Sequence, residues 1–357
     1  MDETLKQLRS RIDSIDDALL ALLSERACVA QQVGRAKNGD KIYRPEREAQ
    51  IVHRLLEANP GPLSGDSIER LFREIMSSCR ALEQNLRVVY LGPAGTFSQA
   101  ALYKQFGHEV EALPEGDIDA CFRAVETARA DFAVVPVENS TEGAVSRTLD
   151  LIVASPLKIC GEIMLPVHQN LMRKGAGLEG IQRVYGHAQS LAQCQNWLNR
   201  HLPHATPISV SSNSEGALRA TAELDSATLG SEVAAELYGL SIIEARIEDE
   251  ACNTTRFLVL GANDAAPSGR DKTSLVLGAP NQPGAIVKLL QPLADAGISM
   301  SKLESRPARS ANWEYVFFVV CEGHRDDAKL SATLAKVAQH AAFFKILGSY
   351  PASSSAF

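Results

Sequence analysis

Two short polar clusters combine the groups needed to bind a carboxylate and to donate a proton. Asn253-Thr254-Thr255-Arg256-Phe257 precedes the apolar run 258–260, and Glu138-Asn139-Ser140-Thr141 follows the apolar run 133–137. A hydroxyl beside a fixed cation can hold a carboxylate and give a proton to a leaving group. Because both clusters flank predicted strands, they favour a cleft at the carboxyl ends of parallel strands. Ordinary capping residues at strand-to-loop transitions would produce the same spacing.

A second set of charged residues accompanies a heptad seam in the first 37 residues. The seam repeats at steps of four and three and comprises Leu8, Ile12, Ile15, Leu19, Leu22, Val29, Val33 and Ala36. This pattern predicts one helix from Glu3 to Lys37, about 50 Å long at 1.5 Å per residue. So long a helix cannot bury its seam against itself, and we expect the same helix of a second chain to cover it.

Two cations, Arg26 and Lys37, lie on one face of this helix, about three turns of 3.6 residues apart. Unpaired buried cations are costly, so an anion such as a small polycarboxylate is expected between them. Arg9 points to a different face and would serve such a ligand only in a neighbouring chain. A salt-bridged dimeric bundle without a ligand is the alternative.

The chain divides into three predicted domains. Residues 1–86 are helical throughout, with further helices beginning near Pro45 and Asp66. Residues 87–262 alternate strands and helices, which predicts an α/β domain with a largely parallel sheet and a crossing between two lobes within 163–183. A linker rich in Ala, Pro, Ser, Gly and Asp leads to 272–350, whose order βαββαβ is ferredoxin-like.

Composition narrows the class of protein. The chain has 357 residues, 45% of them hydrophobic, and a net charge of −7, which argues against nucleic acid as a partner. Its seven cysteines are scattered without a C-x-x-C pair, so we expect neither disulfides nor a metal site. The acidic start of the sequence and the lack of a long apolar run predict a cytoplasmic protein that does not enter a membrane.

The helical region resembles the all-helical class of chorismate mutase. The resemblance rests on Leu8-Arg9-Ser10-Arg11-Ile12, Leu22-Leu23-Ser24-Glu25-Arg26, Val33-Gly34-Arg35-Ala36-Lys37 and Arg44-Pro45-Glu46-Arg47-Glu48. It implies that Arg26, Arg47 and a second subunit's Arg9 hold substrate carboxylates, that Lys37 binds the ether oxygen and that Glu48 binds the ring hydroxyl. Two positions depart from the family pattern, where some members have Ser at Cys79 and Gln at Glu83. Glu83 could donate to the ether oxygen only when protonated, a form that burial would favour.

The central region resembles prephenate dehydratase in three segments, which are 92–98, 135–143 and 253–257. The resemblance implies two lobes that close over the substrate like a periplasmic binding protein, and loss of CO₂ together with a ring hydroxide. Thr255 would protonate the leaving hydroxide and Arg256 would anchor a carboxylate. The other implied cleft residues are Ser98, Glu138, Asn139, Ser140, Gln193 and Thr254. His187 is read as a structural residue in a turn, with general acid as its alternative role.

The last region resembles the ACT domain fused to these dehydratases, through segments 281–286 and 303–307. The implied phenylalanine site comprises Asn281, Gly284, Ala285, Ile286, Glu304 and Ser305. Gly284 would allow close backbone approach, and the amides opening the next helix suit a carboxylate. A ferredoxin-like dimerisation module without a ligand is the alternative.

Together, the resemblances imply a bifunctional chorismate mutase–prephenate dehydratase that is inhibited by phenylalanine. They further imply chorismate and prephenate as substrates, no cofactor, and a homo-oligomer, either a dimer or a dimer of dimers. A chain ending near Gly261 is expected to keep dehydratase activity and to lose the response to phenylalanine. The alternatives are arogenate dehydratase activity and a non-catalytic two-lobed sensor.

Overall fold

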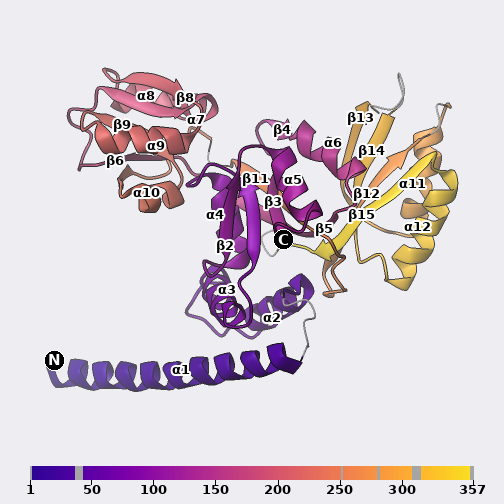
Figure 1. Ribbon diagram of the computed structural model, residues 1–357, viewed down its shortest axis with the longest axis horizontal. Helices are drawn as coiled ribbons and strands as arrows, with labels where there is room; N and C mark the ends of the chain where they lie inside the picture. The colour runs from indigo at the N-terminus through magenta and orange to yellow at the C-terminus, as the bar shows by residue number, and fades with distance from the viewer. Residues whose placement is uncertain (1, 37–42, 251, 280–281, 308–314, 354–357) are drawn as a thin grey trace.

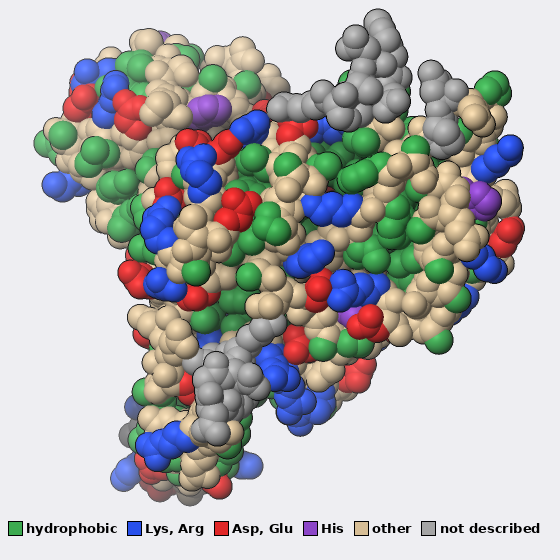
Figure 2. Space-filling view, turned by 45° about the vertical axis from the view of Figure 1, so that its right-hand side comes forward, with side chains coloured by type: hydrophobic (Ala, Val, Ile, Leu, Met, Phe, Trp, Pro, Cys, Tyr) green, Lys and Arg blue, Asp and Glu red, His purple; other side chains and the backbone are tan. Residues whose placement is uncertain are grey.

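The computed structural model describes residues 2–36, 43–250, 252–279, 282–307 and 315–353. Figure 1 shows a long helix along the lower edge, two α/β lobes above it, and a helix-covered sheet at the C-terminal side. Within the described residues, no helix is both long and apolar enough to cross a membrane. On the face shown in Figure 2, acidic and basic side chains are intermingled over most of the surface.

Three helices form the first region: α1 (Asp2–Ala36), α2 (Pro45–Glu57) and α3 (Gly65–Ala81). Pro45 opens α2, as expected for a residue whose missing N–H costs nothing at that position. The Ser64 hydroxyl caps α3 by accepting from the amide of Ser67. The apolar seam of α1 is exposed, and Leu22 keeps 62% of its surface accessible. Among the described residues of one chain no element covers this seam, so a second chain is still expected to cover it.

The first lobe is a mixed sheet of order β2-β1-β3-β11-β5, with β4 pairing β3. Its strands are β1 (Arg87–Leu91), β2 (Glu111–Glu115), β3 (Phe132–Asn139), β4 (Gly143–Ala144), β5 (Lys158–Pro166) and β11 (Thr254–Gly261). Its helices are α4 (Phe97–Phe106), α5 (Ile118–Glu126) and α6 (Ser146–Ala154). The predicted largely parallel sheet is wrong here, because β11 runs antiparallel to both β3 and β5.

The second lobe is a five-stranded sheet of order β10-β6-β9-β7-β8. Its strands are β6 (Asn170–Arg173), β7 (Arg183–His187), β8 (Thr206–Val210), β9 (Ser226–Gly230) and β10 (Ser241–Glu244). Its helices are α7 (Ala188–Gln193), α8 (Gln195–His201), α9 (Asn213–Ala222) and α10 (Glu232–Tyr238). The chain enters through 167–169, and the described residues of its return are 245–250 and 252–253. These crossings run side by side, with the Val167 amide donating to the Asn253 carbonyl at 2.8 Å.

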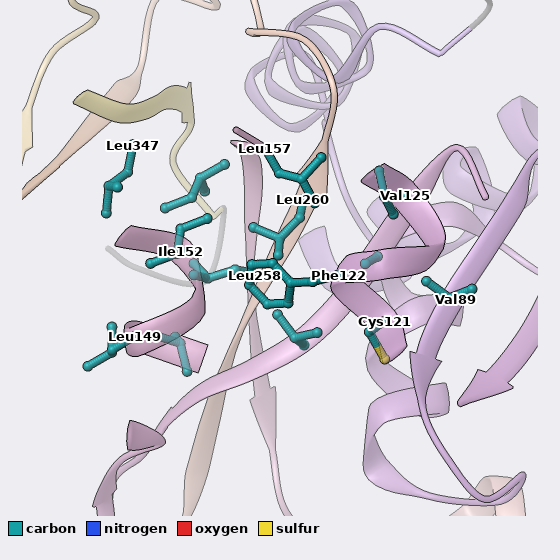
Figure 3. Close-up of a cluster of buried hydrophobic side chains, with 14 of the residues drawn as sticks. Val89, Cys121, Phe122, Val125, Leu149, Ile152, Leu157, Leu258, Leu260 and Leu347 are labelled. Atoms are coloured by element: carbon teal, nitrogen blue, oxygen red, sulfur yellow. The ribbon is translucent and has the colours of Figure 1, made fainter. Parts of the chain in front are cut away.

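The last region confirms the ferredoxin-like prediction. Its elements are β12 (Asp271–Gly278), α11 (Ala285–Asp295), β13 (Met300–Pro307), β14 (Tyr315–Glu322), α12 (Ala328–His340) and β15 (Phe343–Pro351), with sheet order β13-β14-β12-β15. Helices α11 and α12 cover one face of the sheet. The other face shares an apolar cluster with the first lobe, where Leu347 lies near Leu149 and Ile152 of α6 (Figure 3). Because this cluster spans both regions, the first lobe and the last region bury a common core.

Candidate active sites

A cleft of about 290 Å³ lies between the two lobes. The first lobe lines it with Thr96, Ser98, Asn139 and Thr255, the second lobe with His187, Ser190, Gln193 and Asn213, and the crossing with Gln169. A concave site with a few convergent polar groups is the usual form of a small-molecule site.

Asn139 and Thr255 face each other in this cleft, as register partners on β3 and β11. Asn139 Nδ2 lies 2.8 Å from Thr255 Oγ1, while Asn139 Oδ1 accepts from the amides of Thr141 and Glu142. Those two amides fix the orientation of the Asn139 side chain, so its NH₂ group must be the donor to Thr255. Because Thr255 Oγ1 is the acceptor, its own hydrogen remains available to a ligand in the cleft.

The two polar clusters meet, but not for the predicted reason. We expected the carboxyl ends of parallel strands, whereas β3 and β11 are antiparallel. The carboxyl end of β3 and the amino end of β11 therefore lie at the same edge of the sheet. Asn139 and Thr255 come together because they sit at opposite ends of antiparallel neighbours.

The amino end of α4 supplies a second polar wall. Thr96 is the N-cap residue of α4, Ser98 lies in the first turn of the helix, and both residues line the cleft. The Gly95 amide donates to Gln99 Oε1 at 2.6 Å, which holds the preceding turn against the helix. Backbone amides and the positive end of the helix dipole make this wall suitable for a carboxylate.

The second-lobe wall contains residues that sequence reasoning missed. Gln169 is buried and donates to Gln193 Oε1 at 3.1 Å, so the predicted Gln193 is one half of an amide pair. Asn213 donates to Ser190 Oγ at 2.8 Å and accepts from the His187 amide at 2.7 Å. Asn213 lies just beyond β8, which is the same strand-end signal that singled out Asn139. His187 caps α7, in agreement with its structural interpretation.

Two predicted cleft residues point elsewhere. Successive side chains of a strand alternate between its faces, so Glu138 and Arg256 lie opposite Asn139 and Thr255. Arg256 Nη2 lies 2.9 Å from Glu162 Oε2 and 3.0 Å from Tyr350 Oη, and Glu138 binds Lys302 Nζ at 2.7 Å. The interpretations of Arg256 as a substrate-carboxylate anchor and of Glu138 as a cleft residue are therefore wrong for this structure.

Ser140 and Thr254 also lie outside the described lining of the cleft. The Thr254 amide donates to Ser140 Oγ at 3.0 Å, and the Ser140 amide donates to the Thr254 carbonyl at 2.9 Å. The structure thus places these two predicted substrate contacts in the hydrogen bonding that joins β3 to β11. The Ser140 hydroxyl and the Thr254 backbone therefore support the edge on which Asn139 and Thr255 sit.

The helical region brings part of its predicted site together where α1 and α3 meet. Half-buried Arg26 on α1 donates to the Ile75 carbonyl of α3 at 3.5 Å. Cys79 is buried on α3, and Glu83 follows that helix. A Cβ atom at Gly34 would lie 2.5 Å from Glu83 Oε2, so glycine at this position lets α1 pass close to the Glu83 carboxyl. Among the described residues, none hydrogen-bonds that buried oxygen.

Two further predicted mutase residues, Arg9 and Arg47, are exposed, and Lys37 lies outside the described residues. Arg9 follows the seam residue Leu8 on α1, and its exposure is compatible with its predicted service to a second subunit.

The predicted effector residues fall on two faces of the last region. Gly284 has φ +74° and precedes α11, which Ala285 and Ile286 begin. On β13, Ser305 pairs with Phe317 of the helix-side cluster, whereas Glu304 pairs with Phe318, which packs toward the first lobe. Glu304 therefore points away from α11. Asn281 lies outside the described residues.

Comparison with known proteins gives three consecutive family matches. These are chorismate mutase type II over residues 8–84, prephenate dehydratase over 88–265 and the ACT domain over 273–339. The bifunctional chorismate mutase/prephenate dehydratase of Neisseria gonorrhoeae is 51% identical over 355 residues, covering 98% of each chain. The chain belongs to the bifunctional chorismate mutase/prephenate dehydratase family.

Solved structures match about three quarters of the chain. The prephenate dehydratase of Arthrobacter aurescens, in complex with L-Phe, is 32% identical with a TM-score of 0.67, covering 74% of this chain and 89% of that one. GqqA, described as a quorum-quenching acylase, is 28% identical with a TM-score of 0.69, covering 75% and 98%. Since the same fold carries different activities, the residues of the cleft must carry the functional argument.

The chorismate mutase region also contains a cation that sequence reasoning missed. Buried Arg80 pairs with the predicted site residue Glu48 and donates to the Phe106 carbonyl, at the end of α4, at 2.6 Å. Burial raises the pKa of Glu48, while Arg80 and Arg73 lower it in opposition. Arg80 therefore favours the ionised form of Glu48. It also ties the mutase helices to the helix whose other end lines the dehydratase cleft.

Proposed function

We propose that the helical region converts chorismate to prephenate and that the two-lobed cleft converts prephenate to phenylpyruvate. Phenylalanine would inhibit the enzyme through the ACT domain. The observation that carries the dehydratase assignment is the directed Asn139–Thr255 pair at the cleft edge. It supports Thr255 as the proton donor, with Asn139 as the residue that aims it.

In the dehydratase reaction, the bond between the ring and its carboxylate breaks and its electron pair enters the ring as CO₂ leaves. The ring C–O bond breaks at the same time, and the departing hydroxide takes the Thr255 proton to become water. Hydroxide is a poor leaving group, so a positioned donor contributes strongly. The amides at the start of α4, with Ser98, are suited to hold a substrate carboxylate in place of Arg256.

For the mutase we propose a dimeric site that positions the substrate without covalent chemistry. Arg26, Arg47 and the second copy's Arg9 would hold carboxylates, with Cys79 lining the site. Lys37 would stabilise negative charge on the ether oxygen, Glu83 would donate a hydrogen bond to the same oxygen, and Glu48 would bind the ring hydroxyl. The exposed seam of α1 supports a homodimer in which α1 covers its symmetry mate.

A coupled assay with the purified chain tests both activities. Chorismate should give prephenate and then phenylpyruvate, and prephenate supplied directly should give phenylpyruvate. Lys37→Ala should abolish only the first step, because the two proposed sites lie in different domains. Loss of both steps in a folded Lys37→Ala protein would contradict the proposal that the two sites are separate. Faster turnover of arogenate than of prephenate would show that arogenate is the preferred substrate.

A further inference from the structure

Two charged clusters join the ACT domain to the back of the catalytic strand pair. The buried cluster comprises Arg256, Glu162, Lys272 and Tyr350, and the shared-lysine cluster comprises Glu138, Lys302 and Glu304. In each cluster, one partner is the strand neighbour of a proposed catalytic residue. Arg256 follows Thr255, and Glu138 precedes Asn139.

The buried cluster is a rigid attachment. Glu162 has a fully buried side chain, with 0% exposure, and its two oxygens take Arg256 at 2.9 Å and Lys272 at 2.6 Å. Arg256 also donates to Tyr350 Oη at 3.0 Å, and that hydroxyl lies 2.7 Å from Ser274 Oγ. Breaking any of these contacts would leave a buried charge or polar group without its partner, which is strongly unfavourable. This cluster therefore holds β11 to the ACT sheet in one arrangement.

The shared-lysine cluster can change its arrangement. Lys302 Nζ lies 2.7 Å from Glu138 Oε2 and 3.1 Å from Glu304 Oε2, so one cation serves two carboxylates. Glu138 keeps 35% of its side chain exposed, so water can replace a lost contact at modest cost. The position of Lys302 between the two carboxylates therefore depends on the position of β13, the strand that carries both Lys302 and Glu304.

Displacement of Glu138 would reach the catalytic pair through very few bonds. Glu138 and Asn139 are consecutive on β3, and they pair in register with Arg256 and Thr255 on β11. The register shifts between Arg256 and Phe257, so a bulge separates this end from the regular ladder. A bulge interrupts the ladder locally, which lets the end of a strand shift without disturbing the rest of the sheet.

We propose that Lys302 and Glu138 couple the ACT domain to the Asn139–Thr255 pair. Phenylalanine bound beside Ser305 on the α11 face of β13 would shift this strand, which carries Lys302 and Glu304 on its other face. The shift would change how Lys302 is shared, and Glu138 would pass the change to Asn139. Arg256 and Glu162 act as the fixed point about which the shift occurs. This inference rests on the proposed phenylalanine inhibition and names the contacts that transmit it.

Lys302→Gln and Glu138→Gln test the coupling, with the exposed ACT-domain residue Lys336 changed to Gln as a matched control. In Lys302→Gln, uninhibited dehydratase turnover should stay within about twofold, while half-inhibition should need about tenfold more phenylalanine, within the usual range of coupling factors. Calorimetry without prephenate should give phenylalanine affinity close to that of the unchanged chain. The double variant Lys302→Gln/Glu138→Gln should be no less sensitive to phenylalanine inhibition than either single variant.

Each other result has a distinct meaning. If phenylalanine does not inhibit the unchanged chain, the proposed feedback inhibition is wrong. Normal inhibition in Lys302→Gln would overturn the coupling while leaving feedback intact. Loss of phenylalanine binding in Lys302→Gln would make Lys302 an effector contact, and independent effects of the two substitutions in the double variant would show that they do not act as a pair.

Discussion

The Asn139 side chain donates from one nitrogen to both Thr255 Oγ1 and Asn253 Oδ1, each at 2.8 Å. The same side chain accepts two backbone amides from the loop after β3. Asn139 thus links the polar ends of both strands and sets which atom of the Thr255 hydroxyl group faces the cleft. The hydrogen, rather than a lone pair, is left for the substrate.

Thr255→Val should reduce dehydratase turnover by about 10²–10⁴, the usual contribution of a positioned proton donor. Valine keeps the branched shape that suits a strand and removes only the hydroxyl. Steady-state assays on prephenate measure the loss, and unchanged mutase activity on chorismate serves as the control for folding. Near-normal dehydratase turnover would move the donor role to His187, which also lines the cleft.

Asn139→Asp should impair the dehydratase although the two side chains have nearly the same shape. An ionised aspartate can still accept the amides of Thr141 and Glu142, but it cannot donate to Thr255. Thr255 would then donate its own hydrogen to Asp, and we expect turnover at neutral pH to fall by about 10². The loss should shrink as pH falls and the new carboxyl becomes protonated. A neutral-pH rate equal to that of the unchanged chain would contradict the proposed orientation of Thr255.

Arg80→Met should shift the pH dependence of the mutase. Four described groups face Glu48: Arg80 and Arg73 on α3, Arg26 on α1, and Tyr43 before α2. Burial raises the pKa of Glu48, and removing the Arg80 cation removes an opposing effect, so this pKa should rise further. If ionised Glu48 accepts the substrate hydroxyl, activity falls as pH drops through this pKa, and the acid limb should move to higher pH.

Arg80→Lys provides the matched comparison, because it keeps the charge beside Glu48. Its acid limb should move less than that of Arg80→Met, even if both variants lose stability through the Phe106 carbonyl contact. The measurement is kcat/KM for chorismate between about pH 5 and 9, spanning the range in which a raised carboxyl pKa would titrate. Identical acid limbs in the two variants would mean that Arg80 does not control the ionisation of Glu48.

Removal of the ACT domain should damage the dehydratase. The sequence alone predicts the opposite, namely that a chain ending near Gly261 keeps dehydratase activity. Truncation would expose the cluster that Leu347 and Tyr350 share with α6 and β11. It would also leave Arg256 and Glu162 without Lys272 and Tyr350. We expect a shortened chain to aggregate or to lose most turnover, as measured by light scattering and assays on prephenate. A soluble, fully active product would show that the first lobe does not need this contact.

Local patterns determined the elements and most of the domain plan. The heptad seam predicted α1, and the βαββαβ order predicted the ferredoxin-like region, because periodicity and turn residues act over a few neighbouring positions. Strand-end polar residues likewise indicated the cleft, whereas the pairing of Asn139 with Thr255 came from the antiparallel register of β3 and β11. The elements and the strand-end signal depend on which residues follow one another, so a single sequence is enough to find them.

Only the tertiary structure decided which face each strand residue occupies and what lies beyond it. Glu138 and Arg256 share their segments with Asn139 and Thr255, yet they bind ACT-domain partners because strand side chains alternate between faces. Arg80 controls the ionisation of Glu48 in our proposal because it donates to Glu48 and to the Phe106 carbonyl, which lie 32 and 26 positions away in the chain. Such contacts depend on how separate elements dock, and no spacing rule within one segment encodes the direction from which a distant partner arrives.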